Sequence, residues 1–243
     1  MNITVLNRHF STSLIALSLY LLLLSLLCSL GFWQLDRAKQ KQVFLQQQQI
    51  GSQISRLNLN SNNEPAQLVR YRTADISGHY DEQHSFLLDN QIVDGKPGYS
   101  VLTPFLIDGR LEAILVNRGW LPVAADRRQL PDLNLTDSVA SVQGRINQFP
   151  SVGIKLNGAE IPAAGWPALI QLVDAGVLAK HLGYPLMTVQ IELDPQQPNG
   201  YLRHWTTQAT IPPEKHQAYA VQWFGLALTL TGLFIWISTK KTS

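Results

Sequence analysis

The sequence predicts a membrane protein of the α+β class, in which two transmembrane helices flank a mostly antiparallel β-domain with one or two short helices. An uncharged apolar block lies near each end, at residues 14–33 and 218–237. Each block has about 20 residues and reaches about 30 Å as a helix, which is the thickness of the hydrocarbon core of a bilayer. Between the blocks, short apolar runs alternate with Gly-, Asp- and Asn-containing turns, a pattern typical of strands.

The first block is expected to be an uncleaved anchor at residues 14–33, after a short cytoplasmic N-terminus at residues 1–13. Its apolar run is longer than the 7–15 residues of a signal-peptide core, and no A-x-A cleavage site follows it. A lipoprotein interpretation of Cys28 is disfavoured because the bulky Leu27 precedes it. Cys28 is the single cysteine, so one chain has no internal disulfide and no cysteine-based metal site.

Residues 34–62 are predicted to be a polar, largely helical linker that continues out of the membrane. Leu35, Ala38, Gln42 and Leu45 recur near helical spacing. The following "NLNSNNEPA" is rich in turn-forming residues and is expected to end this helix.

Residues 63–211 are expected to form the β-domain. Asp94-Gly95 and Asp108-Gly109 each separate two strand-like runs and suit hairpin turns that need positive φ angles. One short helix is predicted at residues 175–181, with Asp174 as its N-cap and Gly183 just past its end.

The second transmembrane helix, with its outer turn, is expected at residues 212–237, and a cytoplasmic C-terminus at residues 238–243. Lys240 and Lys241 favour a cytoplasmic C-terminus. The basic residues at 37, 39 and 41 outnumber Arg8 and oppose this orientation, but long connecting domains cross largely regardless of charge. No organelle-import leader is visible. We therefore expect two spans in the inner membrane of a bacterial cell, with both termini cytoplasmic and the central domain periplasmic.

Composition and motifs argue against two function classes. The chain has 19 Lys and Arg against 17 Asp and Glu, so it lacks the basic footprint of a nucleic-acid-binding protein. The sequence contains no G-x-S-x-G, H-E-x-x-H or Walker A motif, so catalysis is not expected.

His79 and His84 are interpreted as polar residues around a turn, and His181 as a cation at a helix C-terminus. His204, beside Arg203 and Trp205, is retained as a residue near the membrane.

The string "LVNRGWLP" contains the most unusual residues of the β-domain: Asn117, Arg118, Gly119 and Trp120. A structural interpretation has Asn117 and Gly119 at a strand end and Trp120 in the core. A functional interpretation notes that Arg and Trp are enriched in interaction hot spots. Composition favours the structural interpretation.

His216 lies about one turn into the second predicted span, after Pro212-Pro213. His216, Tyr219, Ala220, Trp223 and Ala227 form one stripe on a helix, and the two alanines leave a shallow gap for a flat aromatic body or a neighbouring helix. The positive end of the helix dipole favours a neutral imidazole, the form that binds haem iron. A polar residue that marks the membrane surface fits the position equally well.

The strings "GFWQLDRAKQK", "SGHY", "GYSVLTP", "LVNRGWLP" and "HQAYAVQWF", in this order, resemble the surfeit locus protein 1 family. These proteins are assembly factors for haem–copper cytochrome c oxidase of the respiratory chain. The resemblance extends over both apolar blocks and the region between them.

This resemblance implies a membrane-anchored chaperone that binds haem a, or helps insert it into oxidase subunit I, without catalysing a reaction. It implies that His216 is the axial ligand and that Tyr219 and Trp223 pack against the macrocycle. His204 is a second ligand to consider, and Arg118 a partner for a haem propionate. The expected partners are subunit I, the lipid bilayer and the haem a synthesis enzyme. A haem-free scaffold for nascent subunits and a membrane-anchored ligand sensor are the alternatives.

Overall fold

The computed structural model describes residues 2–5, 8–61, 67–124, 126–127, 129–133, 135, 139–150, 158–205 and 211–241. The chain divides into two compact units. The helical unit contains Met1–Gln46 and Thr207–Ser243, and the β-domain contains Gln47–Thr206.

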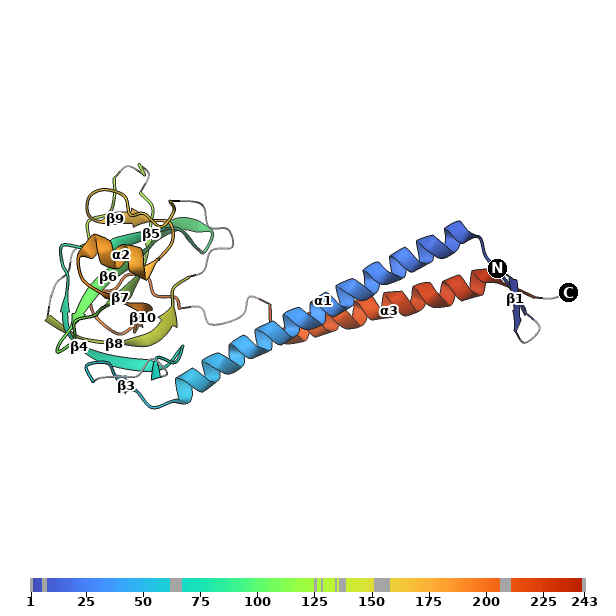
Figure 1. Ribbon diagram of the computed structural model, residues 1–243, viewed down its shortest axis with the longest axis horizontal. Coiled ribbons are helices and arrows are strands. Elements are labelled where there is room, and N and C mark those ends of the chain that lie inside the picture. The colour runs from blue at the N-terminus through green and yellow to red at the C-terminus, as the bar shows by residue number, and fades with distance from the viewer. Residues whose placement is uncertain are drawn as a thin grey trace. The chain divides into compact units, whose positions relative to one another are not determined.

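Two long helices, α1 (Leu14–Gln53) and α3 (Pro213–Ser238), form the helical unit together with a small sheet. α1 is unbroken from the apolar block through the polar run, and its 40 residues span about 60 Å. The helices pair in antiparallel fashion (Figure 1), because Tyr20 near the start of α1 stacks on Phe234 near the end of α3, with ring centroids 4.2 Å apart. The Tyr20 hydroxyl also lies 3.1 Å from Thr231 Oγ1.

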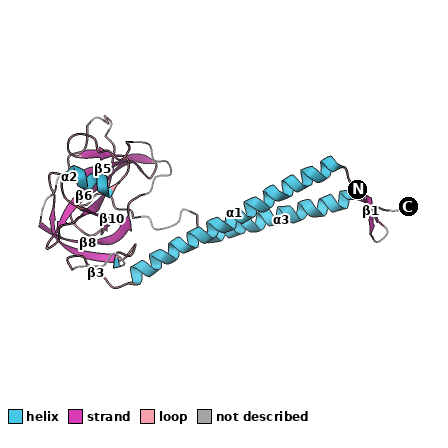
Figure 2. Ribbon diagram, viewed as in Figure 1, coloured by secondary structure: helices cyan, strands magenta, loops and turns pink. Residues whose placement is uncertain are grey.

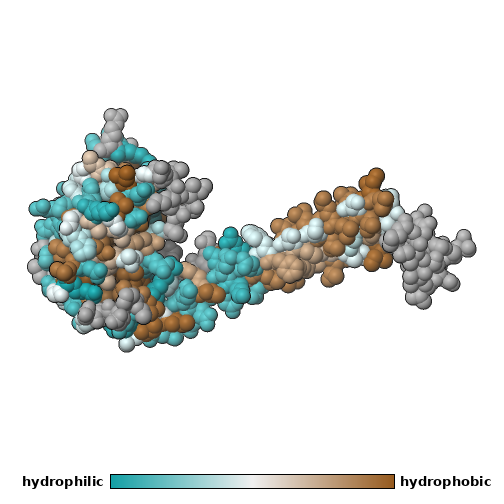
Figure 3. Space-filling view, viewed as in Figure 1, coloured by the Kyte–Doolittle hydropathy of each residue, from teal (hydrophilic) through white to brown (hydrophobic). Residues whose placement is uncertain are grey.

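Both helices are long and apolar enough to cross a membrane. Large apolar side chains such as Leu14, Ile15, Val221 and Leu228 are more than two-thirds exposed. Figure 3 shows hydrophobic residues over much of the visible surface of the paired helices. Exposed apolar surface of this extent is typical of lipid or protein contact.

The two chain ends meet in a three-stranded antiparallel sheet of β1 (Asn2–Val5), β2 (Arg8–Ser11) and β11 (Thr239–Lys241). β11 pairs with β2, with Thr239 opposite Phe10. This sheet lies outside the sequence prediction and places the start of α1 and the end of α3 at the same end of the helix pair.

The β-domain is an eight-stranded sheet that closes on itself (Figure 2). Its strands are β3 (Leu57–Asn58), β4 (Thr73–Tyr80), β5 (Phe86–Val93), β6 (Lys96–Ile107), β7 (Ala113–Pro122), β8 (Val139–Gln148), β9 (Ala168–Ile170) and β10 (Leu186–Leu193). β4, β8, β10, β7 and β6 form a ring, because β6 pairs with β4 at Gly78–Tyr80. β10 and β7 are parallel, and the other ring pairs are antiparallel. Small barrels of five strands, such as the OB-fold, have this architecture.

The predicted turns and the short helix are present. Asp94 and Gly95, with φ of 49° and 75°, join β5 to β6, and Gly109 at 78° lies between β6 and β7. Helix α2 (Ala175–Leu182) begins at Asp174, whose carboxylate accepts hydrogen bonds from the backbone N–H of Gly176 and Val177. These elements form because short polar side chains and glycine supply local bonds and positive φ angles.

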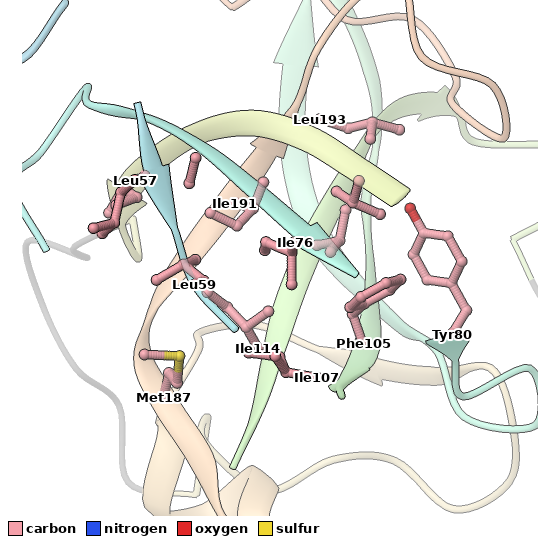
Figure 4. Close-up of a cluster of buried hydrophobic side chains, with 14 residues drawn as sticks. Leu57, Leu59, Ile76, Tyr80, Phe105, Ile107, Ile114, Met187, Ile191 and Leu193 are labelled. Atoms are coloured by element: carbon pink, nitrogen blue, oxygen red, sulfur yellow. The ribbon is translucent and has the colours of Figure 1, made fainter. Parts of the chain in front are cut away.

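Fourteen buried apolar side chains fill the ring interior, and Figure 4 shows ten of them with labels. Phe105, Ile114 and Ile191 are fully buried there, and Tyr80 packs edge-on against Phe105 with centroids 5.0 Å apart. A second cluster packs α2 and the β5–β9 edge against the outside of the ring through Leu178, among others. Apolar clusters inside and outside the ring therefore hold the domain together.

Candidate functional site

His216 lies in the first turn of α3, on the face of the helix that meets α1. Pro213 opens the helix after Pro212, whose extended backbone (φ −70°, ψ 155°) ends the preceding segment. The imidazole is half-buried, and its Nδ1 lies 2.7 Å from the side-chain oxygen Oε1 of Gln34 on α1. The side chain is therefore held by a neighbouring helix.

The Gln34 contact defines which ring nitrogen of His216 is available. A neutral imidazole has one N–H donor and one acceptor nitrogen. An amide oxygen can only accept, so a hydrogen bond between Gln34 Oε1 and Nδ1 requires the tautomer that has its proton on Nδ1 and its lone pair on Nε2. Metal-ligating histidines are held by this kind of second hydrogen bond, so the arrangement fits a haem-iron ligand.

The stripe predicted on α3 divides into a buried part and an accessible part. Ala220 is 1% exposed and Ala227 is 5% exposed, on the face that meets α1. The sequence predicted that the gap beside these alanines would hold a flat aromatic body or a neighbouring helix, and in the structure the helix α1 fills it. Tyr219 is 48% exposed, and Trp223 is half-buried at the edge of the same face. A flat group bound by His216 would therefore lie on the outer edge, beside Tyr219 and Trp223.

His204 belongs to the β-domain, whereas His216 belongs to the helical unit. It is exposed and follows Leu202, which forms an isolated bridge with Trp120 of β7. The adjacent Trp205 is anchored, because its indole Nε1 donates to the backbone oxygen of Leu193 at 2.7 Å.

The residues of "NRGW" lie in β7 and are buried in the β-domain. Asn117, Arg118 and Trp120 are 5%, 1% and 8% exposed. Arg118 occupies a bulge, since the register between β6 and β7 passes from Gly119 directly to Asn117. The motif therefore faces the interior and the structure favours its structural interpretation.

Arg118 binds the segment that follows β10. Its Nε donates to the backbone oxygen of Asn199 at 2.6 Å, and its guanidinium lies 5.0 Å from the ring centroid of Tyr201. Burial lowers the pKa of Arg118, and Tyr201 and Tyr80 partly offset this effect. A guanidinium this deeply enclosed is not exposed to a propionate.

Trp120 and Gly119 also contact the segment that follows β10. The Trp120 N–H donates to the Leu202 oxygen at 2.8 Å, and its indole Nε1 donates to the Gln91 oxygen at 3.0 Å. Gly119 has a φ of 113°, and a Cβ placed there would lie 2.7 Å from the Leu202 oxygen. Glycine is required because both the backbone conformation and the space exclude a side chain.

A cavity of about 430 Å³ lies on the outer side of β4, β8 and β10. Its lining includes Arg203 and Trp205, the two neighbours of His204 in the sequence, but none of the predicted site residues themselves. Tyr71 and Trp205 provide aromatic walls. Arg145 and Glu192 form an ion pair within it, and the carboxylate also accepts from Asn147 at 2.7 Å. Two arginines and two acidic residues line the cavity, so its formal charges balance.

Gln34 is the partner of His216 that sequence reasoning missed. It lies directly after Trp33, at the end of the apolar block. A polar residue at this position is expected where the helix leaves the membrane and becomes solvated, so it did not indicate a partner for His216. Its spacing from Gly31 and Ala38, which are both buried, contained a signal, because residues three and four apart share a helix face. The contact with His216 joins residues 182 positions apart.

Comparison with known proteins identifies the family of the chain. The model of the SURF1 family matches residues 21–228. A SURF1-like protein of Rickettsia felis is 28% identical over 229 residues, covering 88% of this chain and 93% of the relative. Surfeit locus protein 1 of Arabidopsis thaliana is 23% identical, covering 83% and 72%. The cytochrome oxidase assembly protein SHY1 of Saccharomyces cerevisiae is 34% identical over 68 residues, covering 27% and 18%. Because the family match runs from the first apolar helix into the second, the chain belongs to the SURF1 family.

Proposed function

We propose that this protein is a membrane-anchored assembly factor for haem–copper cytochrome c oxidase that holds haem a for insertion into subunit I. Membership of the SURF1 family and the name of the yeast relative, a cytochrome oxidase assembly protein, support the role in oxidase assembly. The observation that carries the haem part is the half-buried His216, which contacts Gln34 through Nδ1 and therefore has Nε2 as the ring nitrogen not used in that contact. Haem a is the cargo in this proposal.

Both α1 and α3 cross the bilayer in this proposal, with the termini on the cytoplasmic side and the β-domain in the periplasm. The pairing of β2 with β11 supports this topology, because it joins the two chain ends at one end of the helix pair. Lys240 and Lys241 after α3 favour the cytoplasm for that end. The membrane is the bacterial inner membrane, where the haem a synthesis enzyme is the source of the cargo.

The work of the protein is binding without catalysis. His216 supplies an axial ligand, and the rings of Tyr219 and Trp223 pack on the macrocycle at the outer edge of the helix pair. Their partial exposure supports this role, since a bound macrocycle would cover apolar ring surface that the helix pair leaves open. His204, the possible second ligand expected from the sequence, belongs to the other unit and stays a prediction.

The test is the absorption spectrum of the protein purified from cells that make haem a. We expect a haem spectrum for the wild type and at least a tenfold loss of pigment for His216→Ala. His181→Ala, at the end of α2 in the β-domain, is the matched control and should retain the pigment. A wild-type protein without pigment, or His216→Ala with undiminished pigment, would refute haem binding.

A haem-free scaffold for nascent oxidase subunits is the second candidate. The Tyr20–Thr231 bond favours it, because this bond joins α1 to α3 just as the His216–Gln34 bond does. Polar contacts of this kind can serve helix pairing alone in membrane proteins. The same purification separates the two functions, because a scaffold would carry oxidase subunit I and no pigment.

A further inference from the structure

We infer that Gln34 is a positioning residue that selects the tautomer of His216, so that Nε2 is the nitrogen presented to an incoming iron. The inference rests on the proposed function, because it assigns a role to the ligand proposed there. It predicts a property of the protein without cargo, which can be measured separately.

The geometry of the contact selects one tautomer. Gln34 Oε1 lies 2.7 Å from His216 Nδ1, a normal distance for a strong N–H···O hydrogen bond. The amide oxygen only accepts, so Nδ1 must carry the proton. If the amide group were reversed, its NH₂ would donate to Nδ1, the proton would move to Nε2, and the ring would have no lone pair for iron.

Gln34 lies between two small buried residues of α1. Gly31 and Ala38 are buried one turn before and one turn after it. A Cβ at Gly31 would lie 2.7 Å from the ring of Phe224, so that ring occupies the space left by the missing side chain. On α3, the buried Ala220 follows His216 by one turn. Small residues flank both partners, as is common where membrane helices pack.

The acceptor is neutral, and this has a chemical consequence. The nearest carboxylate along α1, Asp36, accepts a hydrogen bond from Gln40 at 2.6 Å, and Gln40 in turn accepts one from Arg37 at 3.0 Å. His216 therefore pairs with an uncharged amide. A carboxylate partner makes a ligating imidazole more basic and the metal bond stronger. An amide fixes the direction of the ring without this strengthening, which suits a site that must release its cargo.

The first measurement uses the full-length protein without haem, in detergent, with nitrogen-isotope-labelled histidine. We expect the His216 signal, assigned by its loss in His216→Ala, to show a protonated Nδ1 and an unprotonated Nε2. Gln34→Leu should move it towards the reverse tautomer, which free histidine prefers. Gln42→Leu, an exposed glutamine on the same helix, should leave it unchanged.

The second measurement uses protein from cells that make haem a. Gln34→Leu should lower pigment retention by about 10-fold or more, the usual effect of removing an orienting partner. Gln34→Glu should retain the pigment and lower its midpoint potential, because the acceptor is kept and made stronger.

The outcomes separate the inference from the proposed function. A protonated Nε2 in the wild type, or no change of tautomer in Gln34→Leu, overturns the role of Gln34 even if His216 binds haem. Wild-type protein without pigment overturns haem binding, whichever tautomer is found. The inference about Gln34 stands if the wild type has the expected tautomer and Gln34→Leu changes it, and the pigment measurement then shows whether that tautomer matters for haem.

Discussion

Replacing Arg118 tests whether the most deeply buried charge of the β-domain holds the segment after β10 to the sheet. The side chain is 1% exposed, and its Nε donates to the Asn199 oxygen at 2.6 Å. Arg118→Ala leaves this carbonyl without its donor and leaves a cavity beside Tyr80 and Tyr201. We expect the free energy of unfolding to fall by about 2–5 kcal/mol, the sum of a hydrogen bond to a charged group and a cation–π contact before the cost of burying the charge is subtracted.

The magnitude results from opposing contributions. A hydrogen bond to a charged group contributes about 1.5–3 kcal/mol, and a desolvated cation–π contact about 0.5–2 kcal/mol. Against these, burial lowers the pKa of Arg118, which shows that the charged form is penalised in the folded state. Arg118→Met keeps most of the volume and removes the charge, so its loss should be smaller, about 1–3 kcal/mol from the unsatisfied carbonyl.

The assay is urea unfolding of the full-length protein in detergent, followed by tryptophan fluorescence. The control is Arg56→Met, because the Arg56 side chain is 62% exposed and lies 3.5 Å from Asp75. Exposed pairs of this kind contribute about 0–1 kcal/mol. The reasoning is refuted if Arg118→Ala costs no more than Arg56→Met, or if Arg118→Met is more stable than the wild type. Either result would mean that charge burial outweighs the bonds to Asn199.

Three further predictions concern the β-domain and use the same unfolding assay. Burial raises the pKa of Tyr80 to about 12, so this side chain ionises in the unfolded state at a lower pH than in the folded state. The contribution of Tyr80 to the free energy of unfolding is therefore fully present below a pH of about 10 and is lost as the pH rises towards 12. Tyr80→Phe should flatten this dependence, and an unchanged curve would contradict it. Gly119→Ala should destabilise the domain by about 1–3 kcal/mol from strain alone, plus the clash with the Leu202 oxygen. Gly109→Ala, where φ is also positive and the space is open, should show only the strain. Asp174→Ala should cost about 1 kcal/mol through loss of the α2 N-cap, and Asp174→Asn should cost less.

Local chemistry was sufficient to predict much of the fold. Both apolar helices, the turns at Asp94-Gly95 and Asp108-Gly109, and the cap of α2 depend on residues within a few positions of one another. Hydrophobic length, positive φ and capping bonds are short-range properties, so a single sequence reveals them. The helical stripe that contains His216 could be predicted for the same reason, because it depends only on helical spacing.

The long-range pairings required the tertiary structure. Ring closure between β4 and β6, the interior position of Arg118, and the bond from Gln34 to His216 each join residues far apart in the chain. Alternation in a strand shows that two faces differ, but it does not show which strand will be the neighbour or whether a bulge turns an arginine inward. The sequence by itself determined which segments are apolar, helical or turning, because those preferences are local. The tertiary structure decided that His216 contacts Gln34 through Nδ1, because this partner lies on the other helix, 182 positions away in the chain.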